Sequence, residues 1–530
     1  MCLRFPRHPQ WYALPNATLP KSFAGAAAGA MRLLLHIEAS DWRTAVFVNR
    51  KSAGPVHEGG YSRFSYDVTD LVASGASSAD VAVHVFDPSD SGTQPFGKQK
   101  VSAIDKPRGD HYTPSSGIWG SVWFEAVSSA AAVTALRVTP TMASFRVEVE
   151  AAAAGIRIPD GDAAVIVTVN APGEGGDVVA QANGLVGVPI DVQIPAPRAL
   201  WSAESPSLYR ISLQLSAPGA APADPPADTP STYGGLRTVG MGKDSTNVTR
   251  PLLNGAPVFF NGWLDQGWWP DGLYSAPTDA ALLSDLQAVK AYGLNMLRKH
   301  QKVESQRFYF HASTLGVMLW QDAPQHFFGG ADFQQFLDGA LQMVRDLYSQ
   351  PCVVQWVVFN EGDCVKDKGM HPAEAVARVY GADPTRLVDT NSGGPANDLG
   401  IGDVNDIHHY SPPAFPSPSD SQYASIGEFG GIGFFLEGHV WEEGHCYGYA
   451  DVATSGDLVT KIMGYLDQLK TAQATVSAAV YTQTTDVETE CDGPLLNYDR
   501  TRKLSPEQEQ QLAAANRGLI TGFADRVKLA

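Results

Sequence analysis

The sequence has few cysteines, fewer basic than acidic residues and no long apolar run. Five cysteines occur among 530 residues, and 56 acids outnumber 38 lysines and arginines, which gives a formal net charge of −18. A nucleic-acid partner is not expected, because phosphate binding requires a basic surface. No uninterrupted apolar segment approaches the roughly 18 residues of a membrane-spanning helix, so no membrane span is expected either.

The five cysteines are Cys2, Cys352, Cys364, Cys446 and Cys491. They are odd in number, widely spaced and free of CxxC pairs, so the pattern indicates neither a disulfide framework nor a zinc site. The sequence therefore predicts scattered free thiols.

The N-terminal stretch MCLRFPRHPQWYALP contains no hydrophobic signal core. A cytoplasmic location is the default expectation, and a chain that lacks its true start is the alternative. The sequence gives no indication of the oligomeric state.

The first 238 residues consist of short runs rich in Val, Phe and Tyr, separated by Gly, Pro, Ser and Asp, which is typical of β-sandwiches. We expect one β domain over residues 1–128 and a second over residues 129–238. The Pro/Ala-rich segment 216–235 has no periodicity, and we expect a disordered insertion within a hairpin. ISLQL before it and LRTVGM after it are the expected partner strands.

From about residue 250, apolar strand-like runs alternate with amphipathic helical patterns, which predicts a parallel sheet. Eight such units in about 280 residues predict a (β/α)8 TIM barrel over residues 239–530, whose chemistry would lie at the carboxyl ends of its strands. The eight expected strands are PVFFNGWLD, GLNMLRKH, GVMLWQD, VVQWVVFNE, RLVDTN, VNDIHHY, ASIGEF and AAVYTQ.

Two of these strand ends carry a glutamate. The apolar run VVQWVVF leads into Asn360 and Glu361, and YASIGEFGG places Glu428 at the end of the seventh strand. Successive strand residues point to opposite faces, so Asn360 and Glu361 are expected to diverge unless a bulge redirects one. Glycosidic cleavage uses two facing carboxyl groups. Taken singly, a glutamate at a strand end is more often a solvated loop residue, and the inference depends on the combination of both strand ends with eight strands.

Other polar strand ends suit a sugar site, which needs hydrogen-bonding groups and aromatic faces. Arg298 allows two interpretations, a substrate contact or an ion pair that orients a carboxylate. Tyr410 is either bonded to a carboxylate or packed at the rim. Two histidines suggest a metal, but adjacent strand residues face opposite ways, and we expect neither metal nor cofactor. The candidate substrate-binding residues are Asn360, Arg298, Tyr410, His408, Asp265, Trp320 and Gln483.

The motifs NMLRKHQKVESQRFYF, LGVMLWQDAP, QWVVFNEGD, IGEFGG and AAVYTQTTDVE resemble glycoside hydrolase family 2, which holds β-galactosidases, β-glucuronidases and β-mannosidases. Upstream, DWRTAVFVNRKSAGPVHEGGYSRFSYDVTDLV and SGIWGSVWFEAV resemble the family's jelly roll, and LWSAESPSLYRISLQL resembles the end of its immunoglobulin-like domain. The resemblance therefore implies a multidomain β plus α/β protein with a jelly-roll sandwich, an immunoglobulin-like sandwich and a C-terminal (β/α)8 barrel.

The resemblance also implies roles for individual residues. Glu361 matches the family's acid/base and Glu428 its nucleophile, in a mechanism that retains the anomeric configuration through a covalent glycosyl-enzyme. Asn360 is expected to bond the 2-hydroxyl of the sugar, with Arg298 and Tyr410 close to the nucleophile. The expected partner is a carbohydrate substrate with a terminal β-linked sugar.

Two departures keep an alternative open. The chain starts almost on the Trp11-Tyr12 stretch, which indicates a shortened jelly roll or a truncated chain, and Asp363 follows NEG where an aromatic residue is expected. The alternative is a catalytically inactive carbohydrate-binding protein on the same scaffold, since a fold does not fix a function. Intact Glu361 and Glu428 favour the enzyme.

Overall fold

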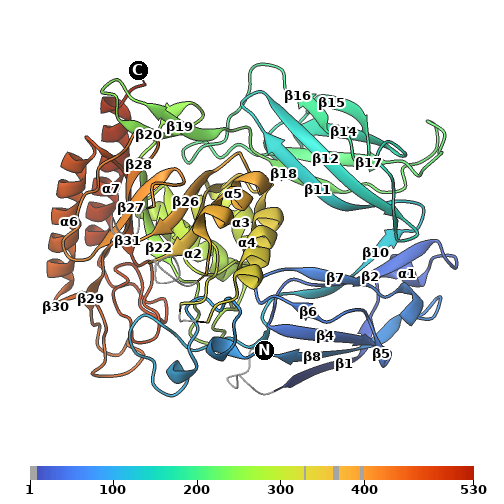
Figure 1. Cartoon of the computed structure of the whole chain (residues 1–530), viewed down its shortest axis with the longest axis horizontal. Coiled ribbons are helices and arrows are strands. Elements are labelled where there is room, and N and C mark those ends of the chain that lie inside the picture. The colour runs from blue at the N-terminus through green and yellow to red at the C-terminus, as the bar shows by residue number, and fades with distance from the viewer. Residues whose placement is uncertain (1–8, 328–329, 362–368, 394–398, 530) are drawn as a thin grey trace.

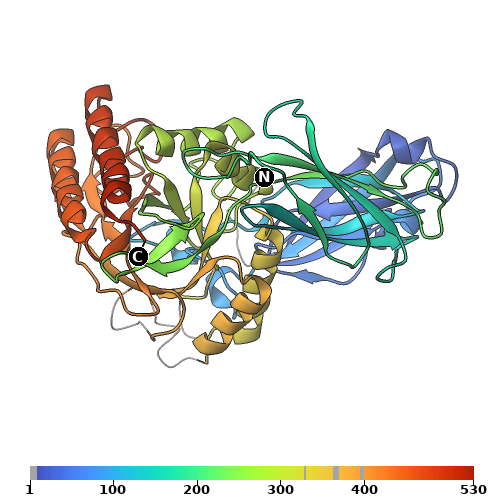
Figure 2. The same ribbon diagram turned by 90° about the horizontal axis from the view of Figure 1, so that it is seen from above.

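The computed structural model describes residues 9–327, 330–361, 369–393 and 399–529. Asp363 lies outside the described residues. Two β-sandwiches lie side by side along one flank of a barrel, as two perpendicular views show (Figures 1 and 2). The predicted combination of β-sandwiches with a parallel barrel is confirmed.

The first sandwich encloses a core that includes Leu33, Leu35, Val46 and Val83. These residues alternate with more exposed ones along their strands, as expected for sheets buried on one face. One sheet holds β1 (Gln10–Thr18), β8 (Ser78–Phe86), β4 (Arg43–Val48), β5 (Lys51–Ser52) and β6 (His57–Glu58). The other elements are β10 (Val122–Ser128), β2 (Met31–Ile37) and β7 (Phe64–Asp67), the pair β3 (Ser40–Asp41) and β9 (Gly117–Ile118), and α1 (Lys21–Ala24).

The second sandwich has its own core, which includes Phe145, Val147, Val167 and Ile211. One sheet comprises β11 (Ala132–Pro140), β12 (Ser144–Ala153), β13 (Ile156–Arg157) and β16 (Ile190–Gln193). The other comprises β15 (Val178–Leu185), β14 (Ala164–Asn170), β17 (Tyr209–Leu215) and β18 (Ser231–Gly234).

The hairpin predicted around the Pro/Ala-rich segment exists, but its second strand is not LRTVGM. β17 pairs antiparallel with β18, which lies inside the segment predicted to be disordered. Leu215 and Asp228 also bridge, so the described turns 216–230 form the hairpin loop. LRTVGM instead contributes to β19 (Val239–Lys243), which pairs with β20 (Thr249–Leu253) and through it with β21 (Ala256–Pro257). The Pro/Ala-rich composition predicted a loop, but β18 forms a short strand because it pairs with β17.

All eight predicted barrel strands are present, in one parallel sheet that is nearly closed. Around the sheet they follow the order β26 (Leu387–Ser392), β25 (Val353–Asn360), β24 (Met318–Asp322), β23 (Met296–Lys299), β22 (Phe260–Asp265), β31 (Val476–Thr482), β28 (Tyr423–Gly430) and β27 (Val404–His409). β25 is buried along its whole length, as expected for a strand covered on both faces.

Helices cover the outside of the barrel: α2 (Asp279–Ala291), α3 (Gln306–Leu315), α4 (Phe333–Leu347), α5 (Pro372–Ala382), α6 (Ser455–Ala472) and α7 (Pro506–Arg526). Their starts follow capping chemistry, for example the capping box of Ser505 and Gln508 at α7. The described parts of the connections after β26 and β27 contain no helix. The short strands β29 (Ile432–Phe434) and β30 (Ala450–Val452) form a separate pair after β28.

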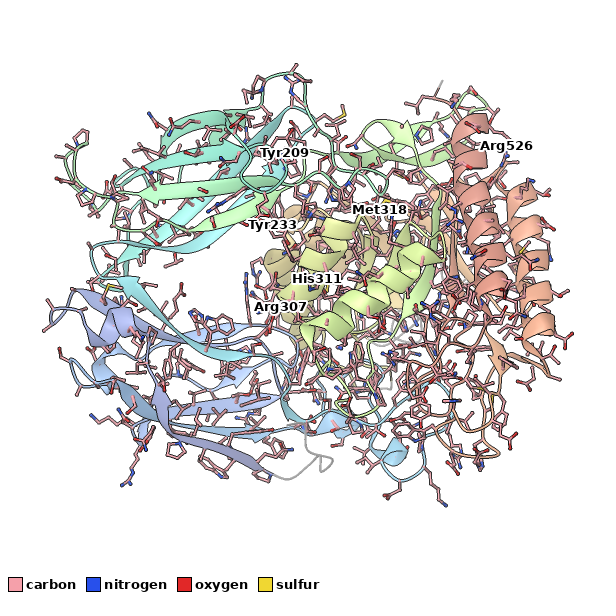
Figure 3. The ribbon with its side chains drawn as sticks, turned by 180° about the vertical axis from the view of Figure 1, so that it is seen from behind. Tyr209, Tyr233, Arg307, His311, Met318 and Arg526 are labelled. Carbon is pink, nitrogen blue, oxygen red and sulfur yellow. A yellow bond between two sulfur atoms is a disulfide. The ribbon has the colours of Figure 1, made fainter. Side chains whose placement is uncertain are left out.

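The second sandwich contacts the barrel through aromatic and amide groups. Tyr233 packs edge-on against Phe310 of α3, and Figure 3 shows Tyr233 near the labelled Arg307 and His311 of the same helix. The indole of Trp201 donates to the Ser313 carbonyl at 2.8 Å. These contacts fix the sandwich against the outer wall of the barrel.

Cys446 and Cys491 form a disulfide, with Cα atoms 5.4 Å apart. The prediction of scattered free thiols is wrong for this pair, because the 45 residues between them gave no recognisable spacing and only the folded barrel brings them together. Cys352 is a buried free thiol, as predicted. Among the described residues, none of the helices combines the length and apolar character needed to cross a bilayer.

Candidate active site

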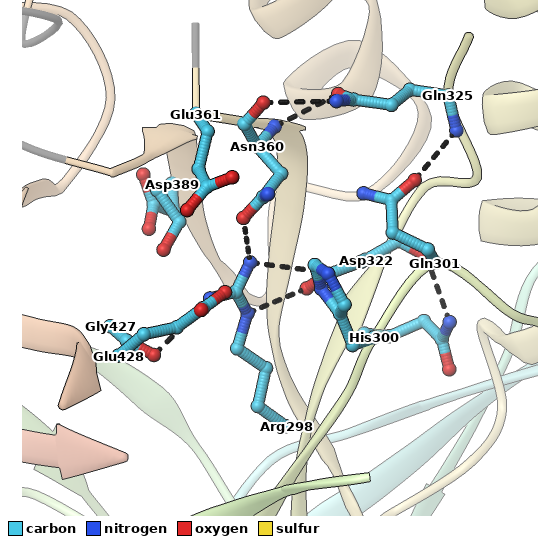
Figure 4. Close-up of polar contacts among 12 residues, drawn as sticks. Arg298, His300, Gln301, Asp322, Gln325, Asn360, Glu361, Asp389, Gly427 and Glu428 are labelled. Carbon is cyan, nitrogen blue, oxygen red and sulfur yellow. Dashed lines mark hydrogen bonds and ion pairs between the residues drawn. The ribbon is translucent and has the colours of Figure 1, made fainter. Parts of the chain in front are cut away.

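Polar side chains gather at the carboxyl ends of the barrel strands, an end that we call the barrel mouth. β23 supplies Arg298, β25 supplies Asn360, β27 supplies His408 and β28 supplies Glu428. Parallel strands bring their carboxyl ends to one rim, so residues far apart in the chain meet there. Figure 4 shows Arg298 between Asp322, Asn360 and Glu428.

Glu361 reaches this cluster through an unusual backbone conformation directly after β25. Its φ is +56°, in the left-handed region that a residue with a side chain rarely adopts. Its N–H donates to the Ser392 carbonyl at 2.6 Å, and a Cβ on Gly393 would approach its Cα to 2.8 Å. The alternation expected for Asn360 and Glu361 is therefore broken, and both side chains take part in the same polar cluster.

One carboxylate oxygen of Glu361 and one of Glu428 lie within 4.8 Å of each other, together with a nitrogen of His408. The side chain of Glu361 is 43% exposed and that of Glu428 is 6% exposed. Carboxyl groups about 5–5.5 Å apart suit direct attack on a sugar, whereas inverting enzymes need about 6.5–9.5 Å to accommodate a water. An approach within 4.8 Å is compatible with the shorter separation.

Arg298 is fully buried and connects the carboxylates of the site. It binds Asp322 through Nε and Nη2 at 3.1 and 2.9 Å, and donates from Nη1 to Glu428 at 3.1 Å. A further bond of 2.7 Å from Nη2 fixes the Asn360 amide oxygen. Of the two interpretations of Arg298, these bonds describe the orienting ion pair, with the guanidinium holding Glu428 and Asn360 in position.

We expect Arg298→Met to lower the free energy of unfolding by about 3–5 kcal/mol, because it leaves Asp322 as a buried carboxylate without its main partner. Urea denaturation followed by tryptophan fluorescence measures the change. Arg146→Met is the matched control, since the Arg146–Asp191 pair is about half exposed and exposed ion pairs contribute little to stability. Equal effects of the two substitutions would contradict the structural role of Arg298.

Tyr410 follows β27 and its hydroxyl donates to Oε2 of Glu428. Its ring stacks on Tyr449 with centroids 3.5 Å apart and planes at 4°. Burial and the neighbouring charge of Glu428 raise the pKa of Tyr410 well above its ordinary value, so the hydroxyl keeps its proton as a donor. The tyrosine therefore holds one oxygen of Glu428 while Arg298 holds the other.

His408 lies between the two glutamates at the end of a hydrogen-bonded chain. Its Nδ1 is 2.9 Å from Oε1 of Glu361, and its Nε2 is 2.8 Å from Oγ of Ser392. Ser392 has one hydroxyl hydrogen, which it donates to Asp406 at 2.6 Å. We therefore assign the proton of the His408–Ser392 bond to Nε2. The remaining proton is shared between Nδ1 of His408 and Glu361.

The charges of this pair stabilise one another. Burial raises the pKa of Glu361, but the hydrogen bond and charge of His408, with Lys98 and His300, outweigh it and lower that pKa to about 2. Burial lowers the pKa of His408, but Glu428 and Glu361 outweigh it and raise that pKa above its ordinary value. Both shifts favour an imidazolium beside an ionised Glu361 in the resting site.

Glu361, His408 and Glu428 are residue types that bind metal ions, and their ligand atoms lie close enough for one. However, Nδ1 of His408 is occupied by the bond to Glu361, and a ligating imidazole must give up that proton. The three side chains therefore form a proton-sharing cluster.

The other predicted substrate residues occupy different surroundings. Asp265 accepts from Lys299 at 2.7 Å and from the Gly267 N–H, within an ion-pair network beside the mouth. Trp320 is fully buried and packs edge-on against Phe260 inside the barrel. Gln483, directly after β31, donates to Asp492 at 3.1 Å. Their contact with a substrate stays a prediction.

A segment of the first sandwich, residues 97–117, also reaches the mouth and was not predicted to do so. Lys98 binds Asp110 at 3.0 Å, Tyr112 donates to Glu490, and the Thr113 N–H donates to Glu488. We call this segment the covering segment. No signal in the sequence connects it with barrel residues 375 and 378 positions later.

Two cavities of about 430 and 480 Å³, both lined in part by Tyr61, lie between the first sandwich and the barrel. They are lined by residues such as Trp42, Trp119 and Val303 rather than by the glutamates of the mouth. Their location assigns them to the junction of the two bodies, and they do not enlarge the candidate active site.

The fold is that of β-glycosidases of glycoside hydrolase family 2. A Lactobacillus rhamnosus β-glucuronidase structure superposes with a TM-score of 0.73 at 18% identity, covering 98% of this chain and 88% of that one. A family 2 glycosyl hydrolase member from Bacteroides cellulosilyticus gives a TM-score of 0.68 at 17% identity, over 96% of this chain and 63% of that one.

Sequence comparison also finds β-glucuronidases, over a shorter part of the chain. The β-glucuronidase of Rattus norvegicus is 25% identical over 238 residues, which is 41% of this chain. The matches span 33% and 20% of the lengths of the curated relatives, and no family model matches the chain. Together with the structures, these relatives confirm the resemblance to glycoside hydrolase family 2.

Proposed function

We propose that the protein is a glycoside hydrolase that releases terminal β-linked sugars with retention of anomeric configuration. The observation that carries the proposal is the position of Glu361 and Glu428, whose carboxylate oxygens lie within 4.8 Å at one barrel mouth. The names of the structural and sequence relatives support the same activity class.

In the first step Glu428 attacks the anomeric carbon and forms a glycosyl ester, while the glycosidic oxygen leaves with the proton that Glu361 shares with Nδ1 of His408. Two bonds, from Tyr410 and Arg298, orient the Glu428 carboxylate for this attack. In the second step Glu361 removes a proton from water, the water oxygen attacks the anomeric carbon, and Glu428 leaves as a carboxylate.

Asn360 is suited to hold the sugar beside these groups. Its amide oxygen is fixed by Arg298 at 2.7 Å. Its Nδ2 is buried and has no hydrogen-bond partner among the described residues. A donor left in this way would bind a substrate oxygen, in line with the expected contact to the sugar 2-hydroxyl.

The test is hydrolysis of a panel of aryl β-glycosides by the purified protein, with release of the aryl alcohol followed by absorbance and the anomer of the sugar product by NMR. We expect turnover of at least one β-glycoside, with the β-anomer formed first. Absence of turnover across the panel, together with measurable sugar binding, would instead support the inactive carbohydrate-binding alternative.

His408→Asn is expected to move the alkaline limb of the pH dependence of kcat/KM to lower pH. In the native site the shared proton is lost only as pH rises through the raised pKa of His408. In the variant Glu361 must hold that proton alone, with an ordinary pKa of 4.5 that burial raises. We expect a shift of at least about one pH unit.

The matched control is His409→Asn, because His409 is the exposed neighbour and its Nδ1 bonds the Pro412 carbonyl instead. Its pH profile should coincide with that of the native protein. An unchanged profile in His408→Asn would show that the acid does not share its proton with this histidine.

A further inference from the structure

Tyr410, which donates to Oε2 of Glu428, lies just outside the barrel sheet. The last pair in the ladder of β27 and β28 joins His409 to Phe429, one residue before Tyr410. The second hydrogen bond of the Tyr410 hydroxyl, to Oγ1 of Thr482, is long at 3.4 Å. The sheet that positions Glu428 therefore does not by itself fix the ring of Tyr410, and the direction of its hydroxyl depends on what packs against that ring.

Tyr449 packs against the ring of Tyr410 face to face. The ring centroids are 3.5 Å apart and the ring planes differ by 4°. Such aromatic contacts stabilise a pair beyond the apolar area that they bury. One whole face of Tyr410 is thus covered, and the ring cannot turn toward that side without losing the stack.

Gly431 lies beside both rings. It follows β28 directly, three residues after Glu428, and its φ is +60°. A Cβ at this position would collide with Cδ2 of Tyr449 and would approach Cδ1 of Tyr410 to 3.0 Å. The Gly431 carbonyl accepts from the N–H of Tyr449 at 2.8 Å, and its N–H donates to the Thr482 carbonyl at 3.0 Å. The stacked pair therefore packs on the segment that continues the strand of Glu428.

A disulfide holds the loop that carries Tyr449. This loop connects β29 and β30, and Cys446, three residues before Tyr449, is bonded to Cys491 of the loop after β31. The N–H of Tyr447 donates to the Thr489 carbonyl at 2.7 Å, and the Tyr447 carbonyl accepts from the N–H of Cys491 at 2.9 Å. One covalent bond and two hydrogen bonds therefore join the two loops just before Tyr449.

The chain is also held directly after Tyr449. Ala450 begins β30 and pairs in parallel with Ile432 of β29. Tyr447 packs edge-on against Tyr449, with ring centroids 5.5 Å apart. Tyr449 is nevertheless 38% exposed, so it is not a core residue. Its fixed position therefore calls for a role other than core packing, and the contact that it makes with the site is the stack on Tyr410.

We propose that Tyr449 is a positioning residue for the nucleophile, because its ring holds Tyr410 in the orientation that keeps the Tyr410 hydroxyl on Glu428. The inference rests on the proposed glycosidase function, in which Glu428 attacks the sugar. Tyr449 acts on Glu428 through Tyr410 and takes no part in making or breaking bonds at the anomeric carbon.

The experiment starts with two substitutions of Tyr449, assayed on the best aryl β-glycoside of the panel. Tyr449→Ala removes the stacked ring and should lower kcat by about 10-fold, the change in rate that corresponds to one aromatic pair. Tyr449→Phe keeps the ring and should retain kcat within about 2-fold of the native value. Native kcat in Tyr449→Ala, or a Tyr449→Phe protein as slow as Tyr449→Ala, would overturn the inference.

Trp123→Ala is the matched control. Trp123 of β10 is 43% exposed and stacks on His36 in the first sandwich, with ring centroids 4.8 Å apart. Its removal deletes a ring of similar exposure and should leave kcat native. Thermal unfolding of both alanine variants reports any loss of fold. A fall in kcat equal to that of Tyr449→Ala would show that the loss of any stacked ring suffices, and would overturn the inference.

A double-mutant cycle separates positioning from loss of structure. Tyr410→Phe lacks the hydroxyl that Tyr449 positions, so adding Tyr449→Ala to this variant should lower kcat by less than about 2-fold. If Tyr449→Ala only reduced the folded fraction, its effect would be the same in both backgrounds. Equal effects would therefore overturn the inference and leave the glycosidase proposal intact.

Two further outcomes are distinguishable. If Tyr410→Phe is too slow to measure, the comparison of Tyr449→Ala with Tyr449→Phe and Trp123→Ala decides. If the native protein turns over none of the β-glycosides, the result counts against the glycosidase proposal and, with it, the inference.

Discussion

Glu428→Ala is expected to reduce kcat on aryl β-glycosides by on the order of 10⁴-fold or more, as removal of a catalytic nucleophile does in other enzymes. Glu428 is held at both oxygens, by Tyr410 and by Arg298, and is only 6% exposed. Among the described residues, no other carboxylate is bound by both Tyr410 and Arg298, so none is placed to replace Glu428 as the nucleophile. Steady-state kinetics on the best substrate of the panel measures the loss.

The control for this substitution is Glu443→Ala, at an exposed glutamate of the loop that follows β29. It should keep native kcat. Thermal unfolding of both variants separates loss of chemistry from loss of fold. A folded Glu428→Ala protein with more than about a tenth of native kcat would exclude Glu428 as the nucleophile.

Glu361→Ala is expected to reduce kcat/KM by about 10²–10⁴-fold on substrates with poor leaving groups, the usual contribution of a positioned acid or base. Substrates with good leaving groups need little protonation, so their first step should be nearly unaffected. The comparison of a 4-nitrophenyl or dinitrophenyl glycoside with an alkyl glycoside measures this difference.

Azide gives a second measurement on the same variant. A small anion can enter the space left by the Glu361 side chain and attack the glycosyl ester in place of activated water, so turnover of a good substrate should recover and a β-glycosyl azide should form. Azide should leave native turnover unchanged. Lack of rescue in an otherwise active enzyme would assign the acid/base role to another group.

The barrel was predictable because most of its strands are apolar runs that end in polar residues. β25 and β28 are buried along their whole length, and such runs have few alternatives to a covered parallel strand. The short strand β18 was missed because its four residues, STYG, lie inside a Pro/Ala-rich segment and are stabilised by pairing with β17. Local composition carries no information about such a partner.

Within the site, the sequence indicated which strands carry the two glutamates but not how their side chains are directed. The left-handed backbone of Glu361 depends on packing against Ser392 and Gly393 of a neighbouring strand. Similarly, the bond between His408 and Glu361 joins residues 47 positions apart. Protonation states follow from such contacts, so the low pKa of Glu361 was not foreseeable from motifs.

The disulfide and the covering segment were unpredictable for a related reason. Cys446 and Cys491 belong to two loops that only the closed barrel places together. Lys98 and Tyr112 approach the mouth from a different sandwich. A single sequence reveals the periodicity within each helix or strand. It does not reveal contacts between loops that are far apart in the chain, and both of these features depend on such contacts.

Because of the covering segment, the mouth is formed by both the first sandwich and the barrel, each of which has its own hydrophobic core. A polypeptide that begins at β19 would retain both glutamates, yet it would expose Glu490 and the Trp268 indole, which donates to the Thr113 carbonyl at 3.2 Å. Because synthesis runs from the N-terminus, the covering segment is made before the barrel strands whose mouth it contacts. The mouth is therefore complete only after the first sandwich has docked onto the barrel.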